Sequence, residues 1–315
     1  MKFEKPVSVQ WLAEFTGSKL TGNTAQEATG INEIHKVQTG DICFVDYEKY
    51  YDTCLNSAAT IIIINKEVEC PEGKTLLVTA DPFSAFVKIV NRFHKFVATD
   101  KMISDDAKIG LGTHIQPGVF IGSNVTIGEN CFIHANVSIY DNTVIGNNVI
   151  LHSGCVLGSD AFYFKRRKDR EVQYDKLVSC GRVIVHDDVE MGSGCTIDKG
   201  VSGDTIIGRG TKFDNQVHIG HGVVVGKNCL FAAQVAVAGK TIVEDEVILW
   251  GQVGVNKDLR VGKGAIVYAQ SGVPSSIEGG KVYFGSPVGE AKAKMRELGW
   301  VKRIPELWEK VVNGK

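Results

Sequence analysis

The densest polar stretch of the chain runs from Asp214 to His221 and holds His218 and His221 beside Asp214 and Asn215. An imidazole titrates near neutral pH, so a histidine in this stretch can act as a general base. Gly239 follows His221 by eighteen residues. If the two lie side by side, the Gly239 N–H can donate to an oxyanion that develops on an attacked carbonyl. The simpler interpretation makes His221 a turn residue and Gly239 a corner glycine.

A second pair of histidines, His134 and His152, shows the same separation of eighteen residues. Two outward, solvated side chains would give this pattern. A metal site between subunits would also give it, but such a zinc site needs three nitrogen ligands on one ion. No third ligand is evident in the sequence, and we therefore expect no bound metal.

Asp160 lies near the start of a segment that continues into a basic run from Lys165 to Lys168. Loops inserted into a regular scaffold often bind ligands, so Asp160 is a candidate substrate contact. The basic run is expected to be solvated surface. Contact with an acidic partner or with a sugar phosphate is the alternative.

Three aromatic residues, Phe44, Tyr47 and Tyr50, are spaced by three around Asp46 and Lys49. Aromatic rings placed in this way can stack on a planar base. Packing in a hydrophobic core is the competing interpretation.

These candidates must be positioned by an internal repeat with a period of six. From Ile109 to Leu157 every sixth residue is a branched aliphatic, and twelve apolar residues keep the same period from Ile207 to Val273. An amphipathic helix would show a period near 3.6 instead. Each hexad is expected to form a short strand and a bend, with its aliphatic side chain inward. Three hexads then make one triangular coil, and stacked coils pair their strands at about 4.8 Å.

One coil of eighteen residues places Gly239 above His221 and stacks His152 on His134. The repeat loses its phase from Ser159 to Arg182. We expect that segment to be an insertion into the β-helix. The β-helix itself is predicted over residues 103–284.

Residues 1–98 lack the repeat and are expected to form an α/β domain. The sequence predicts a helix at Val7–Thr16, buried strands at Ala59–Asn65 and Leu76–Val78, and a helix from Pro82 to about Phe93. Asp81 is the expected N-cap of the last helix, with proline in its first position.

Residues 285–315 are expected to form a helical tail. One helical stretch is predicted to end near Leu298, and a second to begin at Pro305. These helices would cover the open end of the β-helix, where strand edges are otherwise unpaired.

The composition limits the functional classes. A net charge of −1 argues against nucleic acid as a partner, because phosphate binding needs a basic surface. The eight cysteines include no C-x-x-C pair and suit a reducing cytoplasm. No apolar run approaches the ~20 residues that cross a bilayer, and the first residues lack an apolar signal segment. We expect a cytoplasmic protein without a membrane span.

Several motifs together resemble the UDP-3-O-(3-hydroxyacyl)glucosamine N-acyltransferases of lipid A biosynthesis, over nearly the whole chain. The motifs are Thr39–Phe44 with Lys49–Tyr50, Gly181–Val185, Cys195–Gly200, Asp204–Gly208 and Asp214–His221. The resemblance implies a left-handed parallel β-helix, a homotrimer and a uridine-binding N-terminal domain. It implies a 3-hydroxyacyl donor on acyl carrier protein, whose phosphopantetheine carries the thioester, and a UDP-linked glucosamine 2-amine as acceptor. His221 would be the general base, Gly239 the oxyanion donor, and the C-terminal helices a carrier contact, with no further cofactor.

The chain departs from the family pattern at ligand positions. Asp258 stands where the family usually has a second active-site histidine, Tyr47 replaces an asparagine, and Gly222 replaces an asparagine after the base. The family's G-A-D-G-F loop contains Ser159 and Ala161 here. An acetyl- or O-acyltransferase on another nucleotide sugar, a non-catalytic trimer that binds nucleotide sugar, and a zinc hydratase are the alternatives.

Overall fold

The computed structural model describes residues 1–95 and 97–314. Their Cα positions separate into two compact units. The first contains Met1–Lys101 together with Gly158–Val183 and Asp198–Thr205, two segments that lie within the repeat region of the sequence. The second contains Met102–Leu157, Ile184–Ile197 and Ile206–Lys315.

The first unit is built on one six-stranded sheet, ordered β1-β3-β4-β5-β6-β2. Strands β3 to β6 run parallel, and β1 and β2 add to the two edges in antiparallel pairing. The four isoleucines of β5 are completely buried, as expected for a central strand covered on both faces. The bounds are β1 (Lys2–Ser8), β2 (Lys19–Gly22), β3 (Glu27–Ile31), β4 (Asp41–Val45), β5 (Ile61–Ile64) and β6 (Thr75–Val78).

Two of the helices of this unit match the sequence-based expectation. Helix α1 (Val9–Thr16) begins after Ser8, whose hydroxyl accepts a hydrogen bond from the Trp11 N–H. Helix α3 (Pro82–Phe93) begins after Asp81, whose carboxylate caps the Ser84 N–H. Two shorter elements follow β4, the 3₁₀-helix η1 (Glu48–Tyr50) and helix α2 (Tyr51–Leu55).

A β-hairpin occupies the segment where the repeat loses its phase. Strands β16 (Phe164–Arg166) and β17 (Tyr174–Lys176) pair antiparallel. The expected insertion is therefore an ordered hairpin of the first unit.

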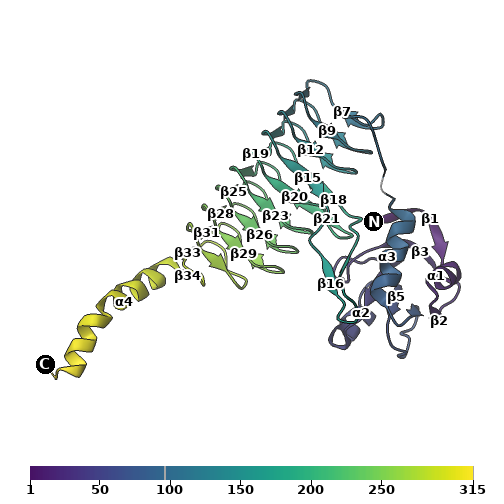
Figure 1. Cartoon of the computed structure of the whole chain (residues 1–315), viewed down its shortest axis with the longest axis horizontal. Helices are drawn as coiled ribbons and strands as arrows, with labels where there is room; N and C mark the ends of the chain where they lie inside the picture. Colours follow the sequence, from purple (N-terminus) through teal and green to yellow (C-terminus); the bar gives the residue numbers. More distant parts are fainter. Residues whose placement is uncertain (96, 315) are drawn as a thin grey trace. The chain divides into compact units, whose positions relative to one another are not determined.

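The second unit is a parallel β-helix whose short strands form three sheets in the described residues (Figure 1). In the regular part, strands pair in register with strands eighteen residues away, as His218 does with Ala236 and Ile219 with Val237. One sheet holds β7 (Lys108–Ile109), β10 (Thr126–Ile127), β13 (Val144–Ile145), β18 (Arg182–Val185), β21 (Asp204–Ile207), β24 (Val224–Val225), β27 (Ile242–Val243) and β30 (Arg260–Val261).

The other two sheets complete each coil. One holds β8 (His114–Ile115), β11 (Phe132–Ile133), β14 (Ile150–Leu151), β19 (Glu190–Met191), β22 (Lys212–Phe213), β25 (Leu230–Phe231), β28 (Ile248–Leu249), β31 (Ile266–Val267), β33 (Val282–Phe284) and β34 (Gly289–Glu290). The last holds β9 (Phe120–Ile121), β12 (Ser138–Ile139), β15 (Val156–Ser159), β20 (Thr196–Asp198), β23 (His218–Ile219), β26 (Ala236–Val237), β29 (Gly254–Val255) and β32 (Gly272–Val273).

The inward positions of the repeat form the core of the β-helix. From Ile121 to Val273 every inward residue predicted from the hexad is buried. Ile109 is 40% exposed, because it belongs to the first coil. Between the strands, corner residues such as Asn124 and Asn142 adopt positive φ angles of 55° and 63°, a conformation that asparagine and glycine tolerate best.

The C-terminal tail differs from its prediction. Helix α4 (Ala291–Val312) is one continuous helix with Pro305 inside it (Figure 1), so the expected division into two helices is wrong. Strong helix formers on both sides of Pro305 continue the helix through the lost hydrogen bond. Ala291 is the buried residue of α4, and its large apolar side chains from Met295 onward are exposed. The expectation that the tail covers the open end of the β-helix is therefore also wrong.

No helix in the part of the chain that the structure describes combines the length and the apolar character needed to cross a membrane.

Candidate active site

His221 lies in the turn that follows β23, with its side chain half-buried. The coil above holds this turn through its backbone, since the Lys240 N–H donates to the His221 carbonyl at 2.9 Å and the Gly220 N–H donates to the Val237 carbonyl at 2.9 Å. Gly222 completes the turn at a φ of 68°. Regular coil-to-coil hydrogen bonds thus fix the backbone that carries the imidazole at one edge of the β-helix.

Gly239 lies against the His221 imidazole, as the eighteen-residue spacing predicted. A Cβ atom built on Gly239 would lie 2.6 Å from Nε2 of His221 and within 2.9 Å of two ring carbons. A side chain at residue 239 would therefore clash with the ring. Glycine lets the imidazole pack directly against the backbone of the coil above.

Asp258 lies one coil above Gly239, whose carbonyl accepts a hydrogen bond from the Asp258 N–H at 3.0 Å. The corner positions Gly222, Lys240 and Asp258 have φ angles of 68°, 66° and 60°. Asparagine and glycine both suit this left-handed backbone. The replacement of the family's asparagine by Gly222 therefore leaves the turn conformation intact.

The other polar residues of this stretch contribute partly to the scaffold. Nδ1 of His218 lies 2.8 Å from the Thr196 hydroxyl on the outer face of the sheet. The Asn215 side-chain oxygen accepts the Ser193 N–H at 2.7 Å, and the Asp214 carboxylate accepts the Asn215 N–H at 2.7 Å. All three candidate side chains are exposed.

His134 and His152 stack as the repeat predicted, with ring centroids 4.9 Å apart and an angle of 13° between the planes. Nε2 of His152 lies 3.1 Å from a carboxylate oxygen of Glu190. Within residues 1–95 and 97–314, no group of three or more histidine, cysteine, aspartate or glutamate side chains is arranged to hold a metal ion.

The three aromatic candidates of the first unit divide into two environments. Phe44 packs on Phe86 and Phe83, with ring centroids 4.7 Å and 6.1 Å apart. Tyr47 and Tyr50 are 60% and 47% exposed. Phe44 thus contributes to the core, whereas the two tyrosines are available at the surface.

The basic run is largely engaged in ion pairs within the first unit. Lys165 pairs with Asp46, and Arg167 pairs with Asp81 at 2.6 Å and with Asp175 at 2.8 Å. Both cations also lie over the Phe83 ring, at 5.4 Å and 5.5 Å from its centroid. The expectation of solvated surface is wrong for Lys165 and Arg167, whose side chains are 20% and 14% exposed.

Asp160 is engaged in a similar way. Its carboxylate pairs with Lys176 and, at 2.9 Å, with Lys199. Partial burial tends to raise the pKa of Asp160, but the hydrogen-bonded lysines outweigh burial and hold the pKa below its ordinary value. The carboxylate is therefore ionised at neutral pH and fixed in place.

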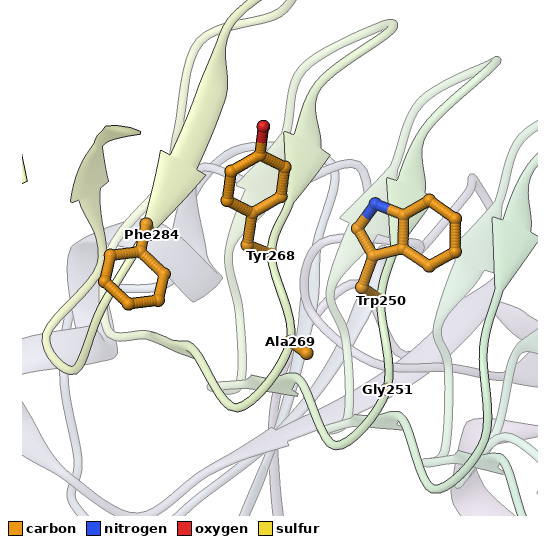
Figure 2. Close-up of a pocket in the computed structure, with 5 residues that line it drawn as sticks. All are labelled: Trp250, Gly251, Tyr268, Ala269 and Phe284. Atoms are coloured by element: carbon orange, nitrogen blue, oxygen red, sulfur yellow. The ribbon is translucent and has the colours of Figure 1, made fainter. Parts of the chain in front are cut away.

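One surface feature was not anticipated from the sequence. An apolar groove of about 540 Å³ is lined by Trp250, Gly251, Tyr268, Ala269 and Phe284 (Figure 2). Trp250 and Tyr268 directly follow β28 and β31, and Phe284 is the last residue of β33, in the same column of the repeat as His134 and His152. That column was the signal in the sequence for Trp250 and Tyr268, since each directly follows a predicted inward position. His221 follows β23, so one chain presents the groove and His221 at different edges of the β-helix.

Family models match both parts of the chain. Residues 26–92 match the model of UDP-3-O-(3-hydroxymyristoyl) glucosamine N-acyltransferase, LpxD. Residues 124–159 and 204–239 match the bacterial transferase hexapeptide model, which describes six repeats. The second of these matches includes both His221 and Gly239.

Solved structures share the fold. A crystal structure of a UDP-N-acetylglucosamine acyltransferase superposes with a TM-score of 0.52 at 24% identity, covering 68% of this chain and 82% of that one. The enzyme of that name from Bacteroides fragilis gives a TM-score of 0.54 at 22% identity, covering 69% and 84%. At these identities the likeness concerns the fold alone, the left-handed parallel β-helix that the family resemblance implied.

Curated relatives decide the family. The UDP-3-O-acylglucosamine N-acyltransferase of Syntrophotalea carbinolica is 40% identical over 236 residues, 67% of this chain and 68% of that protein. The enzyme of the same name from Christiangramia forsetii is 39% identical over 238 residues, 67% of this chain and 69% of that protein. The chain therefore belongs to the UDP-3-O-acylglucosamine N-acyltransferase family and is an N-acyltransferase.

Proposed function

We propose that this enzyme transfers a 3-hydroxyacyl group from acyl carrier protein to the 2-amine of a UDP-3-O-acyl-glucosamine, with His221 as general base. The observation that carries the proposal is the packing of the His221 imidazole directly against Gly239, so close that a Cβ there would lie 2.6 Å from Nε2. Family membership supplies the substrate class.

In the proposed reaction, His221 removes a proton from the sugar amine as its nitrogen attacks the thioester carbonyl. The Gly239 N–H stabilises the oxyanion of the tetrahedral intermediate. When the intermediate collapses, the C–S bond breaks, an amide remains on the sugar, and the thiol of the carrier's phosphopantetheine leaves with the proton. This chemistry needs no covalent enzyme intermediate, and we propose no cofactor beyond the carrier's own prosthetic group.

The nucleotide part of the acceptor is assigned to the first unit, in which we propose residues 1–98 as the uridine-binding domain. The exposed rings of Tyr47 and Tyr50 can stack on the uracil base, with Phe44 supporting them from the core. Asp160, Asp214, Asn215, His218 and Asp258 are proposed to contact the remainder of the acceptor. This assignment extends the family's ligand positions to the matching residues of this chain.

The proposal includes a homotrimer and a docking surface for the carrier. Residues 103–284 are proposed as the acyltransferase domain, active at grooves between neighbouring subunits. Exposed apolar side chains on the outer faces of the sheets, among them Phe132, Leu230 and Ile242, support association. Basic residues of the extension at 285–315 would meet the acidic carrier, and they are Lys292, Lys294, Arg296, Lys302 and Arg303.

The test is an acyl-transfer assay with 3-hydroxyacyl carrier protein and UDP-3-O-acyl-glucosamine. Replacing His221 with alanine is expected to lower kcat by roughly 10²–10⁴, the usual contribution of a general base. His152→Ala, which removes an imidazole at another edge of the β-helix, is the matched control. An inactive wild type that still binds UDP-sugar would contradict the proposed reaction and favour a different acceptor or a binding-only paralogue.

A further inference from the structure

Two thiols in the first unit lie unusually close together. Cys43 is on β4 and Cys54 is on α2, and their sulfur atoms are 3.1 Å apart. Both residues are completely buried. A disulfide bond is about 2.05 Å long, so a movement of about 1 Å separates the pair from a covalent bond.

Five of the other thiols donate to backbone carbonyls, at 3.1–3.3 Å for their shortest contacts, and they are Cys70, Cys131, Cys155, Cys195 and Cys229. Among these five, the side chains of Cys155 and Cys195 also share a hydrogen bond. Cys43 and Cys54 contact each other at 3.1 Å and differ from that pair in lying on either side of the aromatic candidates. The sequence indicated only a reducing compartment for these two cysteines, because they are eleven positions apart and form no C-x-x-C pair.

We propose that Cys43 and Cys54 form a reversible disulfide that fixes the segment between them. This segment carries Phe44, Tyr47 and Tyr50, the aromatic residues assigned to the nucleotide. The effect of the disulfide on nucleotide binding rests on the proposed function, whereas formation of the bond does not.

The oxidant that we propose for this disulfide is a peroxide, which accepts the two electrons that the thiols lose. One thiolate attacks a peroxide oxygen, the O–O bond breaks, and a sulfenic acid and water are formed. The second thiol then attacks the sulfenic sulfur, and a second water leaves as the S–S bond forms. Two thiols are oxidised and one hydrogen peroxide is reduced to two waters; a dithiol reductant reverses the product.

The first step requires a local opening of the segment. A hydrogen bond to Cys54 and burial raise the pKa of Cys43, so the closed form presents little thiolate. However, η1 and α2 start without a side-chain cap, and α2 has only five residues. A hydrogen bond from the Tyr51 hydroxyl to Asn65, at 2.6 Å, ties α2 to the end of β5. Even with this hydrogen bond, the free energy needed to open such a short element is expected to be well below the free energy of global unfolding.

The disulfide is expected to preserve the present arrangement, because the sulfur atoms already lie close together. A covalent link across β4 and α2 reduces the freedom that the aromatic segment loses when a nucleotide binds. Oxidation should therefore strengthen UDP binding by roughly two- to fivefold through preorganisation.

The bond is tested on the full-length protein by hydrogen peroxide treatment, non-reducing peptide mapping and thiol counting in denaturant. We expect a linked peptide pair containing Cys43 and Cys54, the loss of two titratable thiols, and recovery of both with dithiothreitol. Cys54→Ala should lose the link, whereas Cys70→Ala in the same unit should retain it. A wild type that keeps both thiols, or one that links other cysteines, would overturn the proposal.

The effect on nucleotide binding is tested by calorimetric titration of UDP into the reduced and oxidised proteins, which gives the dissociation constant of each form. Equal dissociation constants, with the bond present, would refute the effect on the aromatic segment. Absence of UDP binding to both forms would instead refute the proposed nucleotide site, and the peptide map would still decide whether the bond forms. Cys54→Ala treated with peroxide should bind UDP like the reduced wild type.

Discussion

The two units of the chain encode their structures in different ways. In the β-helix, the position of a residue within the hexad determines whether its side chain is buried, exposed or in a corner. In the first unit, neighbours come from distant parts of the sequence, as in the ion pair between Lys165 and Asp46, which are 119 residues apart. The eighteen-residue period of the β-helix thus places His221 beside Gly239. The positions of the aromatic candidates and of Asp160 in the first unit depend on tertiary packing instead.

The largest expected effect tests the periodic core. Phe231 is completely buried and stacks on Phe213 with ring centroids 5.0 Å apart. Phe231→Ala removes one layer of this stack and should lower the free energy of unfolding by about 3–5 kcal/mol. Chemical denaturation of the wild type and the variant measures the difference.

Phe86→Ala in the first unit is the matched comparison, because Phe86 is 1% exposed. We expect a loss of similar size, since burial and not periodicity sets the cost. A cost below about 1 kcal/mol for Phe231→Ala would mean that the neighbouring coils collapse into the space.

The next effect concerns Gly239, which the repeat places beside the proposed general base His221. Gly239→Ala places a methyl group 2.6 Å from Nε2 of His221, so the imidazole must move from its present position. We expect kcat to fall roughly 10²–10³-fold, because displacement of a general base costs most of its usual contribution. Circular dichroism and the acyl-transfer assay separate folding from activity.

Gly251→Ala provides the control for this substitution. A Cβ at residue 251 would lie 3.5 Å from the Ala233 carbonyl oxygen, an ordinary contact. This variant should fold normally. Full activity of Gly239→Ala would show that the reaction does not need the imidazole in its present position against Gly239.

The third effect is a pH dependence confined to the ion pairs of the first unit. The pKa of Asp160 is lower in the folded chain than its usual value of 3.8, because Lys176 and Lys199 stabilise the carboxylate against the opposing effect of burial. The contribution of the carboxylate is therefore fully present above about pH 5 and is lost as the pH falls through the folded-state pKa.

Asp160→Asn should lower the stability by roughly 0.5–1.5 kcal/mol at pH 7, and by less at pH 3. Denaturation at both pH values measures this difference. The exposed Glu171→Gln serves as a control with little change expected at pH 7. An Asp160→Asn loss that is as large at pH 3 as at pH 7 would contradict the role of the charge.

Sequence reasoning succeeded where one residue type at one position has one physical consequence. The aliphatic hexad positions, the stacked histidines and the contact between His221 and Gly239 all followed from an eighteen-residue coil. Helix α3 followed from its predicted N-cap, Asp81, and helix α1 begins two residues after its predicted start. These features depend on local geometry, which a single sequence contains.

The remaining features depend on which surfaces meet. The Arg167 ion pairs and the approach of Cys43 to Cys54 arise from side chains brought together by packing. Continuity of α4 through Pro305 was missed because a single proline was given more weight than the helix formers around it. The sequence indicated the residue types at these places, but not their partners.

The smallest effect tests the corners of the β-helix. Gln216, Gln234, Gln252 and Gln270 form a ladder of side-chain amide hydrogen bonds of 2.9 Å, 2.8 Å and 3.0 Å. Gln234 has a φ of 60°, which alanine adopts at a cost of roughly 1 kcal/mol and glycine adopts freely. Gln234→Ala and Gln234→Gly remove the same two hydrogen bonds. The difference between their free energies of unfolding therefore measures the cost of the backbone conformation. We expect the glycine variant to be more stable by about 1 kcal/mol in denaturant titrations. A more stable alanine variant would show that the positive φ angle at this corner carries no such cost for a residue with a Cβ.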